Sequence, residues 1–149
     1  MKQLIDEKDE KILEILQENS SLSSHKISKK ILIPVTTVNN RIKKLKKQGV
    51  IKNYTVNLDQ DKLGFNLSAY ILVTISLEEL KRQKMKTKDL IKLIRKDQLV
   101  DFADTVTGDV DIIVKMRGRD IHDLNNYVVN ILSEYTGVER TRTSLILSK

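Results

Sequence analysis

The order of apolar segments in the C-terminal two thirds of the chain restricts its fold more than any other feature. Runs rich in β-branched residues indicate strands, and apolar stripes spaced by three and four residues indicate helices. They follow one another as strand, helix, strand, strand, helix and strand over residues 67–77, 87–96, 100–106, 110–116, 120–136 and 138–147. This order predicts a βαββαβ module, the split βαβ sandwich of the ferredoxin-like class.

Two connections in this module and one face of its sheet lead to further expectations. Thr107-Gly108-Asp109 separates the second and third strands, and glycine there suits the positive φ of a tight hairpin turn. The basic stretch 81–86 precedes the first helix, and we expect it to be a solvated loop. Because both helices cover one face of the sheet, the other face is left bare, which predicts pairing with a second subunit.

Three short helices are expected before this module. Asp6 and Asp9 have the spacing of a capping box at the start of the first helix. Pro34 suits the first turn of the third helix, which ends before Gly49, a residue type common just after helices. Three helices in this order are typical of a helix-turn-helix domain.

These segments divide the chain into two domains and a linker. We place a winged or three-helix helix-turn-helix domain at residues 1–52 and an extended linker or hinge at 53–66. The βαββαβ module follows at 67–149 and is expected to bind an effector and to form oligomers. The predicted fold class is therefore α+β.

The positive charge of the chain is concentrated in its N-terminal third. Residues 1–52 hold 12 Lys and Arg against 6 Asp and Glu, whereas residues 53–149 hold 15 against 14. No acidic residue occurs from 19 to 58. Charges of one sign repel each other, but a cluster of positive charges favours binding to DNA, because each neutralised phosphate releases counterions. On charge alone, a basic and merely solvated helix is the alternative.

The third helix has an apolar inner face and a polar outer face. At about 100° per residue, Val38, Ile42 and Leu45 share one sector, and small hydrogen-bonding residues followed by lysines lie opposite. Thr and Asn can read base edges at the N-terminal part of a recognition helix, and lysine suits phosphate. This pattern favours DNA reading over a solvated helix. The candidate DNA-binding residues are Thr36, Thr37, Asn39, Asn40, Arg41, Lys43, Lys44 and Lys47.

Candidates for catalysis or metal binding are few. The chain has no cysteine, and its two histidines, His25 and His122, have no ligand partner at a suitable spacing. A second set consists of carboxylates alone: Asp101, Asp104, Asp109 and Asp111. Turn and strand-edge positions explain these aspartates better than a metal site or an acid–base pair. With no phosphate loop and no membrane-spanning run, we expect a cytoplasmic protein that is not an enzyme and has no metal or cofactor.

Three motifs occur in a fixed order along the chain. The first is Asp6-x-x-Asp9-x-x-Ile12-Leu13-x-x-Leu16, and the second is Val38-Asn39-Asn40-Arg41-Ile42-Lys43-Lys44-Leu45 with Gly49-Val50-Ile51. The third is Val106-Thr107-Gly108-Asp109-Val110-Asp111. Together they resemble the Lrp/AsnC transcription regulators, also called feast/famine regulators, over essentially the whole chain, and we expect an archaeal member. One departure is Leu32, at a position in the helix-turn-helix turn where the family usually has glycine.

The resemblance implies dimers that bind double-stranded DNA and join into tetramers or octamers through their C-terminal modules. It also implies that an amino acid or related small effector binds between subunits near residues 107–111, where backbone amides can hold a carboxylate. Asp104 stands where relatives often have a bulkier residue, and it would favour lysine, arginine or glutamine as the ligand. The candidate effector-binding residues are Thr107, Gly108, Asp109, Asp111 and Asp104.

The leading hypothesis is a sequence-specific transcriptional regulator modulated by an amino-acid effector. The alternative is an architectural DNA-binding protein of the nucleoid type, with little base readout and no effector. Thr36, Asn39 and Asn40 favour the first, because a specific reader needs such side chains. A third hypothesis, a small-molecule sensor or metabolic enzyme built on the C-terminal module, is opposed in its enzyme form by the lack of catalytic residues.

Overall fold

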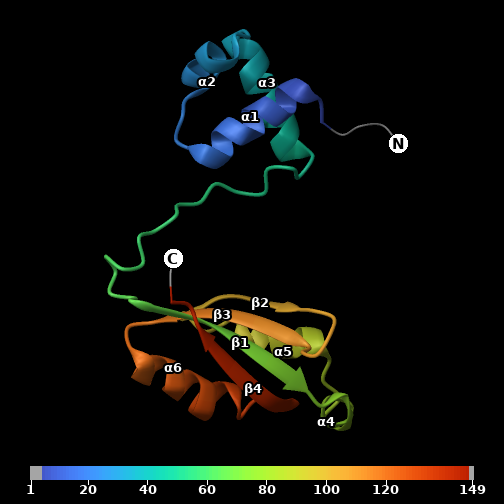
Figure 1. Ribbon diagram of the computed structural model, residues 1–149. Coiled ribbons are helices and arrows are strands. Elements are labelled where there is room, and N and C mark those ends of the chain that lie inside the picture. The colour runs from blue at the N-terminus through green and yellow to red at the C-terminus, as the bar shows by residue number, and fades with distance from the viewer. Residues whose placement is uncertain (1–4, 148–149) are drawn as a thin grey trace. The chain divides into compact units, whose positions relative to one another are not determined.

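The computed structural model describes residues 5–147 and divides the chain into two compact units, Met1–Leu58 and Asp59–Lys149. Residues 1–4 and 148–149, the outer ends of the first and last expected domains, lie outside the described residues. Figure 1 shows helices alone in the first unit and a sheet with helices in the second. The α+β class expected from the sequence is confirmed.

The first unit consists of the helices α1 (Glu7–Glu18), α2 (Ser24–Ile31) and α3 (Val35–Lys47). The capping box at α1 is present, since Asp6 accepts from the Asp9 amide and Asp9 accepts from the Asp6 amide. Pro34 is the N-cap of α3, and Gly49 follows its end with φ +73°. Among residues 5–58 there is no strand, so the described part of this unit has three helices without a wing.

The core of the first unit is small and aliphatic. Its fully buried members are one isoleucine from each of α1 and α2 and a valine and a leucine from α3, namely Ile12, Ile27, Val38 and Leu45. Leu32, which occupies the turn between α2 and α3, has φ +55° and is 89% exposed. The backbone there is thus in the left-handed region that glycine adopts most easily. The turn expected of a helix-turn-helix forms even though leucine stands in that position.

The second unit is an antiparallel sheet of four strands covered on one face by helices. The strands are β1 (Leu67–Ile75), β2 (Val100–Thr105), β3 (Ile112–Gly118) and β4 (Val138–Leu145), in the spatial order β2-β3-β1-β4. The helices α5 (Thr87–Ile94) and α6 (Ile121–Tyr127) complete the βαββαβ order. This topology confirms the ferredoxin-like module predicted from the sequence.

Two local expectations in this unit were wrong. The basic stretch expected to be a loop begins inside a helix, α4 (Leu77–Arg82), because Ser76 caps it and Leu80 is buried at 2% exposure. The last helix was expected to be continuous, but α6 passes into a π-helical turn, Val128–Leu132. Ile121, the first apolar residue of the helix expected over 120–136, is 60% exposed. The π-helical turn ends at Leu132 with Ser133 as its C-cap, and Gly137, with φ +88°, follows only after a further turn.

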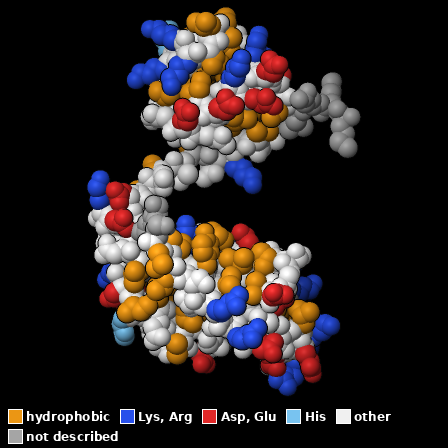
Figure 2. Space-filling model, in the orientation of Figure 1, with side chains coloured by type: hydrophobic (Ala, Val, Ile, Leu, Met, Phe, Trp, Pro, Cys, Tyr) orange, Lys and Arg blue, Asp and Glu red, His pale blue; other side chains and the backbone are white. Residues whose placement is uncertain are grey.

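Alternation along the strands separates the two faces of the sheet. Ala69, Ile71 and Val73 of β1 are fully buried against the helices. The residues between them lie on the opposite face, where the rings of Tyr70 and Phe102 pack at a tilt of 55° with their centroids 6.4 Å apart and are 39% and 37% exposed. Figure 2 shows hydrophobic side chains gathered over the second unit. The described helices therefore leave this face bare, as the sequence pattern predicts.

Candidate DNA-binding surface and effector site

The outer face of α3 carries polar side chains that form no hydrogen bond or ion pair with the other described residues. Thr36, Asn39, Asn40, Lys43 and Lys47 are exposed, and Thr37 is half-buried. Within residues 5–147 no hydrogen bond or ion pair forms at the side chains of these six residues. Figure 2 shows basic side chains around the first unit. Donors and acceptors at one end of α3 and ammonium groups at the other are thus free to meet a ligand.

Arg41 is placed differently from the other candidates. Its Nη1 lies 2.7 Å from Asp6 Oδ1 and 2.8 Å from Oδ1 of Asp9, whose side chain is fully buried. The Arg41 side chain itself is 22% exposed. The guanidinium therefore joins α3 to the start of α1. Lys44 also reaches toward Asp9, at 3.5 Å, but it is 49% exposed.

These contacts change the acidity of the groups involved. Burial opposes ionisation of Asp9, but hydrogen bonds from Arg41 and the Asp6 amide outweigh it and lower its pKa. The Arg41 hydrogen bond, followed by that of the Asp9 amide, also lowers the pKa of Asp6. The two carboxylates in turn raise the pKa of Arg41. All three groups are charged near neutral pH, so the link between α1 and α3 is a charge-assisted one.

The sequence held a signal for this role of Arg41. At about 100° per residue, Arg41 lies about 60° from Val38, which places it at the border of the buried face of α3. The Asp6 and Asp9 carboxylates at the start of α1 supply the matching charge. The angle and the two aspartates together indicate an internal ion pair.

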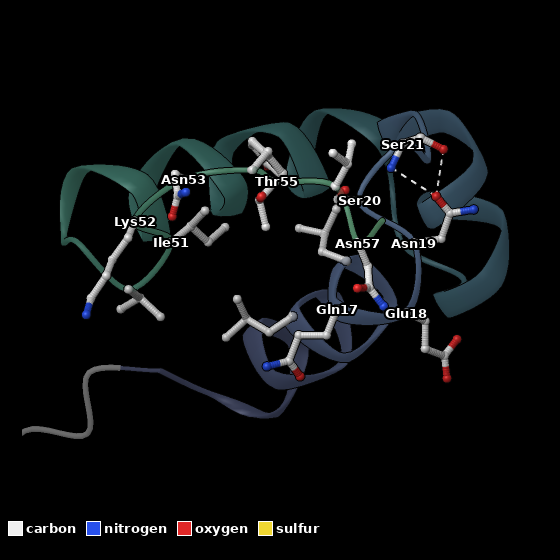
Figure 3. Close-up of a pocket in the computed structure, with 15 residues that line it drawn as sticks. Gln17, Glu18, Asn19, Ser20, Ser21, Ile51, Lys52, Asn53, Thr55 and Asn57 are labelled. Atoms are coloured by element: carbon white, nitrogen blue, oxygen red, sulfur yellow. Dashed lines mark hydrogen bonds between the residues drawn. The ribbon is translucent and has the colours of Figure 1, made fainter. Parts of the chain in front are cut away.

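A hollow of the first unit lies apart from the outer face of α3. It has a volume of about 670 Å³ and is bounded by the end of α1 and by residues 50–57. Figure 3 shows the turn at its rim, where the Ser21 amide and hydroxyl both donate to the Asn19 side chain. Its walls hold only two charged side chains, Glu18 and Lys52. This hollow shows no convergence of chemical groups that would mark a ligand site.

The 107–111 turn joins β2 to β3 as a hairpin. Gly108 has φ +119°, and a Cβ placed there would meet no atom within 4 Å, so the turn is open to solvent. Thr107 and Asp109 are exposed beside it. Asp109 also lines a cavity on the bare face of the sheet, together with residues of β1 and β4.

Asp111 and Asp104 are engaged in contacts within the chain. The Asp111 carboxylate accepts a hydrogen bond of 2.9 Å from the Ile75 amide and so holds the end of β1. Asp104 pairs with Arg95 of α5 at 2.6 Å. The structure therefore brings Thr107, Gly108 and Asp109 together at an open turn and gives the other two aspartates structural partners.

Metal binding and membrane insertion find no support in the described residues. Over residues 5–147 no three His, Cys, Asp or Glu side chains come close enough together to hold a metal ion. In the same range there is no helix with the length and apolarity needed to cross a membrane.

Comparison with known proteins identifies both units. Residues 5–52 match the family model of winged helix-turn-helix DNA-binding domains, and residues 68–149 match that of the Lrp/AsnC ligand binding domain. The chain belongs to the Lrp/AsnC family. An uncharacterized HTH-type transcriptional regulator of Pyrococcus furiosus is 41% identical over 143 residues, which cover 96% of this chain and 91% of that protein.

Other relatives support the same family assignment. The HTH-type transcriptional regulator FL11 of Pyrococcus furiosus is 33% identical over 99% of this chain and 92% of its own length. The L-Met complex of a transcriptional regulator from Neisseria meningitidis superposes with a TM-score of 0.88 at 26% identity, covering 97% of this chain and 91% of the other. The structure of E. coli AsnC, at 22% identity and a TM-score of 0.84 over 99% and 95% of the two chains, shows the same fold.

Membership of this Lrp/AsnC family decides between the hypotheses. The protein is a DNA-binding transcriptional regulator with a ligand-binding domain, and the architectural alternative is disfavoured. The matching families are regulatory and not enzymatic. The Pyrococcus relatives also support the expectation of an archaeal member.

Proposed function

We propose that this Lrp/AsnC protein reads its operator with the outer face of α3 and responds to an amino acid bound beside the 107–111 turn. The observation that carries the first part is that the side chains of Thr36, Asn39 and Asn40, next to exposed lysines, form no hydrogen bond or ion pair with any residue from 5 to 147. Small polar side chains at the N-terminal part of a recognition helix can pair with base edges, and the lysines with phosphate. Arg41 acts in this proposal by holding α3 against α1. Since the target is the chromosome, we place the protein in the cytoplasm.

The reading face is tested by two substitutions with different expected results. Asn40→Ala is expected to reduce discrimination between operator and random DNA by about 1–3 kcal/mol, because a base contact is lost. Lys47→Ala is expected to weaken binding to operator and to random DNA equally. It should also reduce the slope of log affinity against log salt concentration by about one unit, because one phosphate contact is lost. Binding is measured by fluorescence anisotropy at several salt concentrations, on the operator located by footprinting upstream of the protein's own gene.

Lys11→Ala serves as the matched control, because Lys11 is an exposed lysine of α1 outside the proposed surface. It should leave the affinity for both DNAs within twofold of the wild type. If Asn40→Ala keeps full discrimination while operator binding persists, α3 does not read the operator in the way proposed.

The bare face of the sheet supports a dimer. Tyr70, Leu72, Phe102 and Ile113 lie on it by register, and an apolar surface of this kind usually meets a partner. A twofold dimer would bring two α3 helices to half-sites one helical turn apart. The resemblance to the family extends this proposal to tetramers or octamers. The Neisseria regulator that was solved with L-Met supports an amino-acid effector for this chain too.

Dimerisation is tested by placing a charge on that face. Tyr70→Glu is expected to shift the protein toward monomers at micromolar concentration, because an apolar ring at the interface is replaced by a carboxylate that would lose its water, and Lys115, its cross-strand neighbour, compensates this cost only in part. Ile121→Glu is the control, since Ile121 is 60% exposed on α6, away from the bare face. The mass is measured by light scattering. An unchanged mass for Tyr70→Glu, or a wild-type monomer, would exclude this interface.

A further inference from the structure

A second cavity lies on the bare face of the sheet, next to the 107–111 turn. Its volume is about 650 Å³. It is lined by Leu72 and Thr74 of β1, by Asp109 and Val110 of the turn, and by Arg140, Thr141 and Arg142 of β4. All of these residues belong to the second unit.

The two arginines face the cavity together because of the strand register. Arg140 is paired with Thr74 and Arg142 with Leu72 across the β1–β4 ladder. Residues two apart on a strand share a face and lie about 7 Å apart. Both side chains belong to exposed residues. Two guanidinium groups therefore stand on one side of the same hollow.

These two arginines differ from every other arginine of the chain. The remaining ones, Arg41, Arg82, Arg95, Arg117 and Arg119, each form an ion pair with an aspartate or glutamate. Arg140 and Arg142 form none with any described residue, and neither does Asp109. Two uncompensated positive charges this close repel each other, so a bound anion would relieve that repulsion.

The geometry points to an acidic α-amino acid, glutamate or aspartate, as the ligand of this cavity; this inference rests on the effector role proposed for the adjacent turn. The lining carries two positive charges and one negative charge, and an acidic amino acid carries the complementary set. Each guanidinium can hold one carboxylate through two parallel hydrogen bonds. The Asp109 carboxylate can accept from the α-ammonium group.

The position of the cavity is compatible with the proposed dimer. Tyr70, whose ring packs against Phe102 of β2, lies in the first half of β1, whereas Thr74 lies near the end of that strand. Four residues of strand separate Tyr70 from Thr74, which is about 13 Å. The apolar part of the face and the charged cavity are therefore neighbours that share Leu72. Asp104, paired with Arg95, has no part in this proposal.

Calorimetric titration of the full-length protein tests the ligand class. L-glutamate or L-aspartate is expected to bind, with L-glutamine at least thirtyfold weaker, because glutamine has nearly the same shape without the second negative charge. L-lysine and sulfate should show no comparable affinity. Arg140→Gln and Arg142→Gln are each expected to weaken binding at least tenfold. Arg119→Gln is the matched control, since Arg119 pairs with Asp123 elsewhere and its loss should leave the affinity unchanged.

The role of Asp109 is tested separately. Asp109→Asn should weaken the binding of glutamate but strengthen that of glutarate, which has the two carboxylates and no amine, because a like charge next to it is removed. Circular dichroism of each variant checks that the fold is retained. Loss of binding in the arginine variants with retained fold supports the proposal.

Three outcomes would overturn the inference, and they differ in what else they affect. Binding of sulfate as tightly as glutamate would reduce the site to a general anion site. Preference for a neutral or basic amino acid, unaffected by the arginine variants, would exclude an acidic ligand while the effector proposal stands. No response to any amino acid would remove the effector proposal as well, and leave DNA reading by α3 unaffected.

Discussion

Replacing Gly137 by alanine is expected to lower the free energy of unfolding of the second unit by about 3 kcal/mol. Gly137 has φ +88°, and left-handed backbone costs a residue with a Cβ about 1–2 kcal/mol. A Cβ there would also lie 2.5 Å from Cδ2 of the buried Leu80, and overpacking of this kind typically costs about 1–3 kcal/mol. For a unit of this size the melting temperature should fall by about 15 °C, as measured by scanning calorimetry.

Gly64→Ala provides the control that separates the two causes. Gly64 has a similar φ of +85°, but a Cβ there would meet no atom within 4 Å. It should therefore show the backbone cost alone. In a double-mutant cycle, Leu80→Ala should make Gly137→Ala less harmful by about 1 kcal/mol or more, since the contact is removed. Equal effects of Gly64→Ala and Gly137→Ala would contradict a role for the Leu80 contact.

The second large effect is expected at Asp9. Asp9→Ala should destabilise the first unit by about 3 kcal/mol, because Arg41 loses its buried partner and α1 loses part of its capping box. The value is at the low end of the range for buried pairs, since Arg41 is 22% exposed and keeps Asp6. A three-helix unit with so small a core has little stability to lose. Hydrogen exchange of α1 and α3 amides measures the loss.

Glu10→Ala is the matched control, because Glu10 is an exposed acid in the same helical turn. Its effect should remain below about 0.5 kcal/mol. Exchanging both members of the buried pair for apolar residues, Asp9→Leu with Arg41→Met, should recover much of the lost stability. If Asp9→Ala and Glu10→Ala have the same effect, the ion pair contributes little to the unit.

The same contacts make the first unit sensitive to acid. The pKa of Asp9 is lowered in the folded state, so the unfolded chain takes up its proton first as the pH falls. The stabilisation is complete above the unfolded value of about 4 and is lost as the pH falls through the lower folded value. In Asp9→Ala the loss of unfolding free energy on acidification should be smaller than in the wild type. Unfolding curves between pH 6 and 2 measure this difference.

Much of the fold could be predicted because local signals agreed with it. The Asp6 and Asp9 capping box, the Gly108 turn and the strand–helix order of the second unit depend on short-range spacing, and each is present. The helix α4 was missed because its basic residues suggested a loop, whereas Leu80, its one buried side chain, has no apolar stripe to reveal it. Periodicity detects repeated burial and cannot detect a single anchor.

The candidate sites were harder to predict because side chains choose partners distant in the sequence. Arg41 and Asp9 are 32 residues apart, and Ile75 and Asp111 are 36 apart. From composition alone, such a charged residue can equally well be expected to bind a ligand or to form an ion pair that stabilises the fold. The pairing of Arg140 with Thr74 could not be read from the sequence either, because strand register depends on the folded sheet.

The division of α3 into an inner and an outer face has a consequence for how a gene-regulatory network can change. Its inner residues and Arg41 maintain the unit, while the side chains proposed to meet the bases form no hydrogen bond or ion pair with the described residues that a substitution would break. Mutations at Thr36, Asn39 or Asn40 should thus alter the preferred operator at little cost in stability. After gene duplication, copies of such a regulator could acquire new target promoters by a few surface substitutions, without compensating changes in the core.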